Sequence, residues 1–296
     1  MLFRSCIKEA SLYIASGNSF YAQPRTLQEA LKLRSSKPNA LLVNGATDVA
    51  LRVTKKNEAL NEIIDLSAIS ELKFIEKKKN EINFGAGLGL ENIKNNIEKE
   101  LPALHKMLAV FGSRQIRSLA TAGGNIASAS PIGDLLPLLI AYNANIHLIS
   151  INGKRKIPIR EFIIGYRQTV MMPDEIIESI NIPLQDTHTV IQFYKVSKRK
   201  DLDISTVSGG FMLKLADGLI SEIVLAFGGM AATTTRAKKA EDFLLGKLWN
   251  REHVTIAGEI IYNEFIPISD ARSGKEFRKI AARNLLIKFW SENQAG

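Results

Sequence analysis

The hydrophobic pattern near the start of the chain predicts a small unit in which helices and strands alternate. Apolar residues at helical spacing over residues 27–31 follow Thr26, and Glu29 stands three residues after this threonine, as in a capping box. Residues 41–43 and 62–66 are short apolar runs of the kind that form buried strands.

From residue 71 the pattern changes to short strands and helices in mixed order. Strands are predicted at 74–76, 82–84, 146–149 and 176–182, and helices at 90–97 and 104–110. Pro183 ends the last of these strands, and the polar segment 185–189 that follows it is a predicted domain boundary.

Beyond this boundary, strand patterns precede helical ones. The strands are predicted at 191–196, 206–213 and 219–227, and the helices at 237–245, 254–265 and 275–290. Strands followed by helices predict an α+β domain with an antiparallel sheet and helices on one face.

Composition limits the class of protein. The chain has 296 residues, of which 46% are hydrophobic and 23% charged, as in globular proteins. The longest apolar run, 135–141, is too short to cross a bilayer, and no apolar stretch follows Arg4 as in a secretory signal. The single cysteine, Cys6, excludes an internal disulfide. We therefore expect a cytoplasmic protein that does not bind a membrane.

The net charge of +9 raises the alternative of a basic nucleic-acid-binding module. The basic residues are, however, interleaved with acids, as over 91–94, or form short runs such as 77–79. No arginine-rich arm and no basic stripe with aromatic residues is present. A solvated surface, or docking onto an acidic partner subunit, explains the charge more simply.

Residues 43–49, Val-Asn-Gly-Ala-Thr-Asp-Val, connect a predicted strand to a helix. Gly45 allows a sharp turn and the close approach of a ligand to the backbone, and amides at such a turn favour an anion such as pyrophosphate. The alternative is an ordinary strand-to-helix turn in which Thr47 or Asp48 caps the helix. Taken alone, the motif favours this second interpretation.

Residues 121–134 are dense in glycine, serine, alanine and asparagine, without a clear helix or strand period. Small side chains leave backbone amides open to a ligand, and Asn125 adds a short hydrogen-bonding group. Asp134 precedes an apolar run, so it either caps a buried helix or accepts a hydrogen bond from a ribose or a ring N–H. Because a buried polar loop needs partners for its polar atoms, a bound cofactor is favoured here.

Residues 194–205 carry four cations and two carboxylates among their first ten positions, between two predicted strands. A charged hairpin explains this composition. Lys195, however, alternates in phase with Ile191 and Phe193, so it is predicted to face inward.

Other motifs carry no chemistry of their own. Residues 85–90 resemble a dinucleotide fingerprint, but Leu90 replaces the third glycine, so no Rossmann site is predicted. The four histidines have no metal-ligand spacing, and no serine or cysteine nucleophile motif is present. We predict neither catalytic side chains nor a metal site, which fits a protein whose cofactor does the chemistry.

Taken together, these segments resemble the FAD-binding domain of the xanthine dehydrogenase family, and specifically the small chain of the bacterial enzymes. The resemblance extends from about Phe20 almost to the C-terminus. It rests on motifs in the family's order, at 42–49, 114–118, 122–126, 130–134, 165–169, 197–199 with 203–205, 228–231 and 283–286.

The resemblance implies an α+β fold made of a two-part FAD-binding domain of the PCMH type and a C-terminal α+β domain. The expected divisions are residues 1–19 as an N-terminal remnant or linker, 20–184 as the FAD-binding domain with subdomains at about 20–70 and 71–184, and 185–296 as the C-terminal flavoprotein domain.

By the same resemblance, particular residues would bind FAD. The turn would wrap the pyrophosphate, the small-residue segment would contact phosphate and flavin, and Ile177 and Lys195 would lie near the isoalloxazine ring. The full set is Leu42, Val43, Asn44, Gly45, Ala46, Thr47, Asp48, Val49, Phe111, Thr121, Ala122, Gly123, Gly124, Asn125, Asp134, Ile177 and Lys195. Asn44 departs from the alanine or glycine expected at its position.

The resemblance also implies a place in a larger enzyme. A molybdenum cofactor on a partner chain would hydroxylate a purine, 2Fe-2S clusters would pass electrons on, and FAD would deliver a hydride to NAD. The cysteine-rich 2Fe-2S domain that normally begins the small chain is not in this sequence, and residues 6–10 look like part of a helix. Either the clusters lie on a separate partner subunit of a hetero-oligomer, or the chain is a fragment that lacks its N-terminal 2Fe-2S domain, and we expect the second. The alternative is the flavin subunit of a carbon monoxide, aldehyde or N-heterocycle dehydrogenase.

Overall fold

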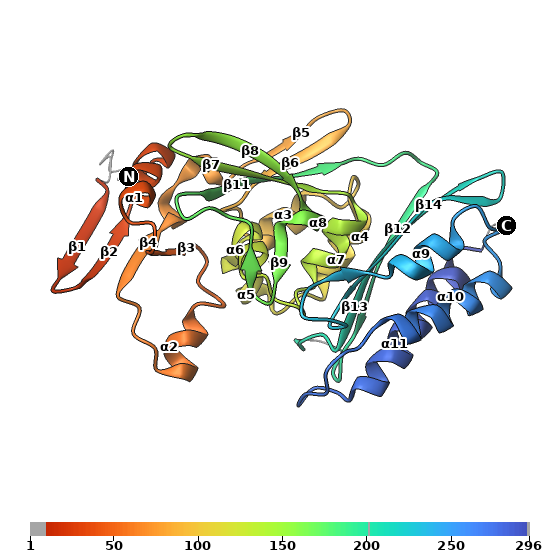
Figure 1. Ribbon diagram of the computed structural model, residues 1–296. Helices are drawn as coiled ribbons and strands as arrows, with labels where there is room; N and C mark the ends of the chain where they lie inside the picture. The colour runs from red at the N-terminus through yellow and green to blue at the C-terminus, as the bar shows by residue number, and fades with distance from the viewer. Residues whose placement is uncertain (1–9, 201, 295–296) are drawn as a thin grey trace, which may run out of the picture.

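The computed structural model describes residues 10–200 and 202–294. Its first unit contains β1 (Leu12–Ser16), β2 (Ser19–Gln23), α1 (Leu27–Ser36), β3 (Leu41–Val43), α2 (Ala50–Lys56) and β4 (Glu62–Asp65). The sheet has the order β1-β2-β4-β3, in which β1 is antiparallel to β2 and the other pairs are parallel (Figure 1). Side chains such as Ala30 and Ile64 form its core.

At the start of this unit, one prediction from the sequence is confirmed and one strand was not predicted. The predicted capping box is confirmed, because Thr26 Oγ1 accepts from the amide of Glu29 at 3.2 Å and the Glu29 carboxylate accepts from the Thr26 amide at 3.3 Å. Strand β1 was not predicted, since all five of its residues are exposed and give no alternation. Residues 6–9 of the predicted N-terminal helix lie outside the described residues.

The second unit is a sheet with one face covered by helices (Figure 1). It contains the short 3-10 turns η1 (Leu66–Ala68) and η2 (Ser70–Leu72), then β5 (Ile75–Lys77), β6 (Glu81–Gly85), α3 (Leu90–Asn96), α4 (Pro102–Ala109), α5 (Arg114–Leu119), α6 (Ala122–Ala127), α7 (Leu135–Ala141), β7 (Asn145–Ser150), β8 (Gly153–Pro158), α8 (Ile159–Phe162), β9 (Ile163–Gly165), β10 (Gln168–Thr169) and β11 (Ile176–Pro183). The main sheet is antiparallel, with the order β5-β6-β11-β7-β8. Ile82, Ile146 and Ile180 point into the helical core, as strand alternation requires.

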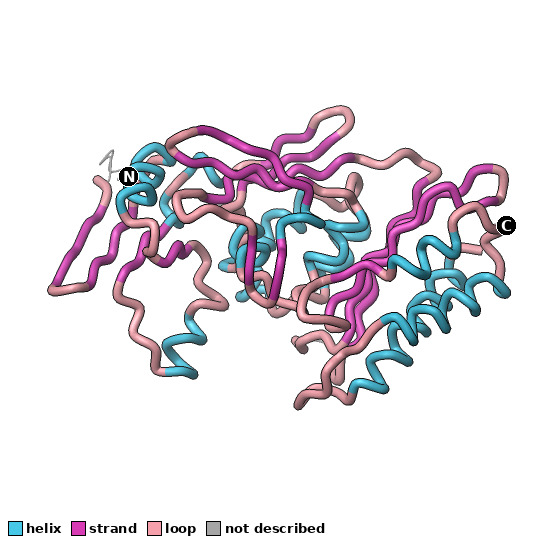
Figure 2. The backbone as a smooth tube through the Cα atoms, viewed as in Figure 1, coloured by secondary structure: helices cyan, strands magenta, loops and turns pink. Residues whose placement is uncertain are grey.

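The third unit is the α+β domain that the sequence predicts. It contains β12 (Thr189–Val196), β13 (Val207–Ala216), β14 (Leu219–Gly228), β15 (Thr235–Arg236), α9 (Lys238–Leu244), α10 (Arg251–Glu264) and α11 (Lys275–Glu292). Its antiparallel sheet has the order β12-β13-β14-β15, and its own helices cover one face (Figure 2).

Helix α7 of the second unit covers the other face of this sheet, where it packs on β13 and β14. The approach is close: a Cβ on Gly210 would lie 2.3 Å from the carbonyl carbon of Pro137. A residue larger than glycine would push the two units apart. Helix α7 therefore brings its first residues to the junction between the units.

None of the helices in the described part of the chain combines the length and the apolar character that a membrane span requires.

Candidate functional site

A cleft of about 880 Å³ lies where the three units meet. Its walls come from the turn after β3, from the segment around α6, and from β12 with the loop that follows it. Most of the predicted FAD-binding residues line it, namely Leu42, Val43, Asn44, Gly45, Ala46, Thr47, Asp48, Val49, Phe111, Thr121, Gly124, Asn125, Asp134 and Lys195. Gly45 and Gly124 therefore share one cleft.

The turn between β3 and α2 lines this cleft and contains main-chain amides without a hydrogen-bond partner in the described residues. Within the described residues, the amides of Gly45, Ala46, Thr47, Asp48 and Val49 donate to no acceptor. Neither Thr47 nor Asp48 caps α2, whose N-cap is Val49 with no side-chain bond, so the ordinary capped turn was the wrong interpretation. Unpaired amides in a concave turn favour an anionic ligand.

The backbone of this turn is held in an uncommon conformation. Ala46 has a φ of 57°, in the left-handed region that residues with a Cβ rarely adopt. Gly45 packs so tightly that a Cβ would lie 1.8 Å from the carbonyl oxygen of Leu119. The glycine is thus required by the neighbouring chain, and the strained alanine beside it completes the turn that lines the cleft.

The small-residue segment is built differently from its prediction. Residues 122–127 form helix α6, with Thr121 as N-cap accepting from the amide of Gly124 at 3.2 Å. The amides of Ala122 and Gly123 donate to the carbonyls of Leu88 and Ala86. Thus the first amides of α6 already have partners, and for this part of the segment the prediction that its amides are open to a ligand was wrong.

Side chains of α6, instead, offer groups to the cleft. The Oδ1 atom of Asn125 is buried and has no hydrogen-bond partner within the described residues. Gly124 is exposed to the cleft, and a Cβ there would approach only Thr121 Oγ1, at 2.9 Å. A buried amide oxygen without a partner calls for a donor, which a polar ligand would supply.

A buried ion pair closes the cleft where the second and third units meet. Lys195 Nζ lies 2.8 Å from Asp134 Oδ2 and donates more weakly to the carbonyl of Val110, at 3.4 Å. Ser205 Oγ donates a short hydrogen bond to the other oxygen of Asp134. Asp134 therefore does not cap α7 through its side chain. The inward orientation predicted for Lys195 is confirmed, since its side chain is only 9% exposed.

Phe111 lies in a loop of the cleft wall that an internal ion pair fixes. The guanidinium of Arg117 donates to the carbonyls of Phe111 and Gly112, at 2.9 and 3.1 Å, and to Glu91 at 2.6 Å. The hydrogen bond from Arg117 lowers the pKa of the Glu91 carboxyl. Sequence reasoning gave Arg117 no role, although it belongs to one of the family motifs.

Three predicted residues do not line the cleft. Ala122 and Gly123 are buried beneath it, where a Cβ on Gly123 would lie 2.6 Å from that of Ala86. Ile177 lies in β11, is 4% exposed and packs in the helical core.

Conversely, sequence reasoning missed Arg34 and Arg167, which do line the cleft. Arg34 donates to the carbonyl of Ala40 at 2.7 Å, while its Nε is buried without a partner within the described residues. Arg167 pairs with Asp48 at 3.3 Å, across 119 positions of sequence. No local pattern reports such distant contacts.

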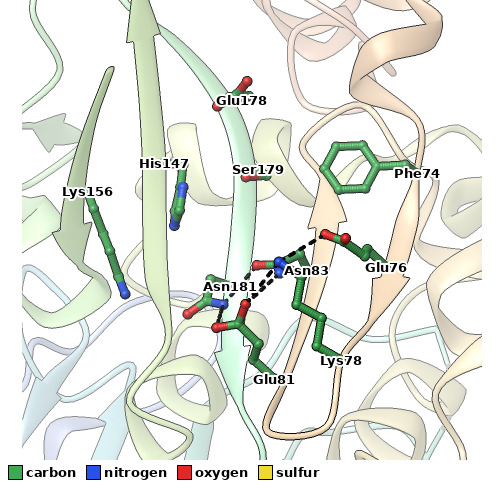
Figure 3. Close-up of a pocket in the computed structure, with 10 residues that line it drawn as sticks. All are labelled: Phe74, Glu76, Lys78, Glu81, Asn83, His147, Lys156, Glu178, Ser179 and Asn181. Atoms are coloured by element: carbon green, nitrogen blue, oxygen red, sulfur yellow. Dashed lines mark hydrogen bonds and ion pairs between the residues drawn. The ribbon is translucent and has the colours of Figure 1, made fainter. Parts of the chain in front are cut away.

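A second hollow, of about 270 Å³, lies on the face of the five-stranded sheet opposite the helical core (Figure 3). Asn181 Nδ2 donates to Asn83 Oδ1 and to Glu81 Oε2, at 2.8 Å each. Burial, together with the nearby charge of Lys156, lowers the pKa of His147, which lines the same hollow. The amide and carboxylate groups of this hollow thus bond to one another, whereas the Nε2 atom of His147 is buried without a partner within the described residues.

Two families match most of the chain. Residues 15–185 match the FAD binding domain in molybdopterin dehydrogenase, and residues 192–293 match the CO dehydrogenase flavoprotein C-terminal domain.

Individual relatives agree with these matches. The xanthine dehydrogenase/oxidase of Gallus gallus is 34% identical over 285 residues, which make up 91% of this chain and 21% of that protein. The nicotinate hydroxylase of Emericella nidulans is 33% identical over 294 residues, 92% of this chain and 22% of that protein. The chain thus spans about a fifth of the length of these curated relatives.

A solved structure shares the fold. A chain of the carbon monoxide dehydrogenase from Hydrogenophaga pseudoflava superposes with a TM-score of 0.86 and 24% identity, covering 93% of this chain and 96% of that one. The family matches and this shared fold each cover most of the chain. The chain therefore belongs to the family of FAD-binding domains of molybdopterin dehydrogenases.

Proposed function

We propose that this chain holds FAD in the cleft at the junction of its three units and is the flavin module of a xanthine dehydrogenase-like molybdenum hydroxylase. The observation that carries the proposal is the row of unpaired amides from Gly45 to Val49 in a cleft closed by the Lys195–Asp134 pair. The division of the chain at about residue 185, between the two family matches, is part of this proposal.

The turn after β3 would hold the pyrophosphate. Its amides can donate to phosphate oxygens without losing any bond within the protein, because none of them has a partner in the described residues. Gly124, which lacks a side chain on the cleft surface, would let the dinucleotide pass close to α6. The free Oδ1 of Asn125 would accept from a hydroxyl or N–H of the cofactor.

The opposite end of the cleft would hold the isoalloxazine ring. Phe111 offers an apolar surface, and the buried ammonium of Lys195 offers a positive charge. Such a charge favours electron density on the adjacent part of a flavin. Asp134 binds that ammonium and accepts a hydrogen bond from Ser205, and little of the lysine side chain is exposed to solvent.

When bound, FAD supplies a carrier that exchanges electrons singly or as a hydride. In the holoenzyme, a partner's molybdenum cofactor would oxidise a C–H group with water and 2Fe-2S clusters would carry two electrons to this chain. The overall change is R–H + H₂O + NAD⁺ to R–OH + NADH + H⁺, which balances atoms and electrons. Xanthine as R–H, and NAD as acceptor, follow the resemblance to xanthine dehydrogenases.

Flavin titration tests the cofactor proposal. The purified chain should quench the fluorescence of added FAD with a 1:1 end point, and phosphodiesterase treatment of the released cofactor should convert it to FMN. A chain that is folded by circular dichroism but does not retain FAD overturns the proposal. Preference for FMN over FAD overturns the assignment of the pyrophosphate turn.

Isolation of the complete complex, through a tag on this chain, tests the substrate and the acceptor. Xanthine should reduce NAD⁺, whereas carbon monoxide, aldehydes and nicotinate should not. Turnover with one of these other substrates would place the chain in a different enzyme of the family. Reduction of oxygen without NAD⁺ would overturn the proposed acceptor.

A further inference from the structure

Behind the cleft, outside its lining, lies a buried arginine. Arg278, on α11, is 2% exposed, although it carries a permanent charge. Its Nη2 donates to Asp270 Oδ1 at 2.8 Å, and its Nη1 donates to the carbonyls of Thr206 and Gly229. Removing the charge of an arginine from water costs free energy. The hydrogen bonds that this buried guanidinium makes to two backbone carbonyls therefore need an explanation.

Each of these carbonyls belongs to a segment that continues to the cleft. Thr206 follows Ser205, whose hydroxyl donates to Asp134. Gly229 donates its amide to the carbonyl of Pro131 at 2.7 Å, three residues before Asp134. One guanidinium therefore binds two segments of the chain, one of which contacts Asp134 through Ser205 and the other of which contacts Pro131.

The packing around Gly229 shows how closely this contact is fitted. Its φ of +82° lies in the left-handed region, and a Cβ would be 2.4 Å from the carbonyl oxygen of Thr206 and 3.0 Å from Arg278 Nη1. Only glycine allows the guanidinium to reach both carbonyls. The carboxylate that binds the guanidinium is itself fixed, since Asp270 Oδ1 also accepts hydrogen bonds from the amides of Arg272 and Ser273.

We propose that Arg278 is a positioning residue: through Thr206 and Gly229 it sets where Ser205 and Asp134 stand, and so fixes the Lys195 ammonium in the cleft. This inference rests on the proposed function, because it assigns Arg278 an effect on FAD without contact to it. The planar guanidinium is essential, since its separate N–H groups reach two carbonyls and a carboxylate at once. A lysine keeps the charge but not this fork.

A double-mutant cycle on FAD affinity tests the proposal. The four proteins are the wild type, Arg278→Lys, Ser205→Ala and the double variant, with Arg283→Lys as a matched control on the same helix. Arg283 pairs instead with Glu259, at 3.0 Å. If Arg278 acts through Ser205, each single variant weakens FAD binding by about fivefold or more and the double variant is little worse than either, as expected for residues of one network.

A spectroscopic reading separates positioning from general stability. The visible absorption maximum of bound FAD should shift in Arg278→Lys and Ser205→Ala alike, and remain unchanged in Arg283→Lys. Additive losses of affinity, or an unshifted spectrum in Arg278→Lys, overturn the proposal. If wild-type protein fails to bind FAD, the proposed function fails instead, and the two failures are therefore distinguishable.

A second variant covers the case in which Arg278→Lys does not fold. Asp270→Asn retains Arg278 and the size of its partner, but weakens the charge that orients the fork. It should give a smaller shift of the same spectrum and a smaller loss of affinity. Wild-type behaviour in both measurements would contradict the proposal, since the fork would then need no orienting partner.

Discussion

The turn after β3 and the segment around α6 are both rich in small residues and both line the cleft, yet they work in different ways. The turn leaves the amides of Gly45 to Val49 without a partner among the residues that the structure describes. The first amides of α6 are all bonded within the protein, and Gly123 serves packing against Ala86. The first region offers a ligand its main chain, whereas the second offers side chains, from Asn125 to Asp134.

This difference shows that density of glycine does not by itself identify a main-chain binding site. What matters is whether the amides have other acceptors, and that depends on residues far away in sequence, such as Ala86 and Leu88. The comparison predicts that side-chain substitutions weaken FAD binding when they lie in the segment around α6, but not when they lie in the turn after β3. Changes in backbone geometry should weaken FAD binding when they lie in the turn.

The largest effect is expected from Lys195→Met. It leaves the carboxylate of Asp134 buried without its cation, and breaking such a pair costs about 3–5 kcal/mol. Urea unfolding should show this loss, together with lost FAD retention. The double variant Lys195→Met/Asp134→Asn should recover much of the stability but not the affinity. If Lys195→Met is as stable as the wild type, the ion pair does not stabilise the segment from α6 to Asp134.

Gly45→Ala should come next, because its new Cβ would overlap the carbonyl oxygen of Leu119. Overpacking of this kind costs about 2–3 kcal/mol, and the displaced turn should also bind FAD poorly. Thermal unfolding and FAD titration measure the two effects. Gly274→Ala is the control, since no atom lies within 4 Å of a Cβ at that position. Normal FAD binding by Gly45→Ala would mean that the turn does not contact the cofactor.

Gly124→Val should abolish FAD retention on gel filtration while the fold is largely kept. The branched side chain would enter the cleft, and in the protein itself only Thr121 Oγ1 is near. We expect a loss of affinity of at least about tenfold, or about 1.4 kcal/mol, with little change in melting temperature. Unchanged flavin occupancy would remove α6 from the site.

The smallest expected effect comes from a pair of substitutions, one in each region, and it compares the two regions most directly. Asn125→Ala removes a free amide oxygen, so FAD binding should weaken by about 1 kcal/mol, as for the loss of one hydrogen bond. Thr47→Ala in the turn should change the affinity very little, because that region is expected to act through its main chain. Isothermal titration measures both. Equal losses in the two variants would mean that the regions do not differ as proposed.

Much of the fold follows from local patterns in the sequence. The strands around Ile146 and Ile180 alternate because one face packs on helices, and the capping box at Thr26 needs only four consecutive residues. Helices α5 and α6 were missed, since they are short and the small residues of α6 carry no apolar stripe. β1 was missed because no side chain of the strand is buried.

The site was predictable where its residues cluster in sequence. Lys195 was placed inward by its phase along β12. The pattern around Asp134 left open a helix cap or a contact to a ligand, and the resemblance assigned it to the site. Ile177 was expected in the site by resemblance, but its side chain packs in the core. The partners that give these residues their roles, such as Arg278 to Thr206 across 72 positions, arise only from the folded chain.

The position of the cleft between the units has a thermodynamic consequence. A ligand that contacts the turn after β3, α6 and β12 at once can bind tightly only while these parts are docked on one another. By thermodynamic linkage, a bound ligand then stabilises the docked arrangement of these parts by the same free energy by which docking strengthens the binding of the ligand. Calorimetry of the empty chain should therefore show separate melting steps that merge into one as the cleft fills.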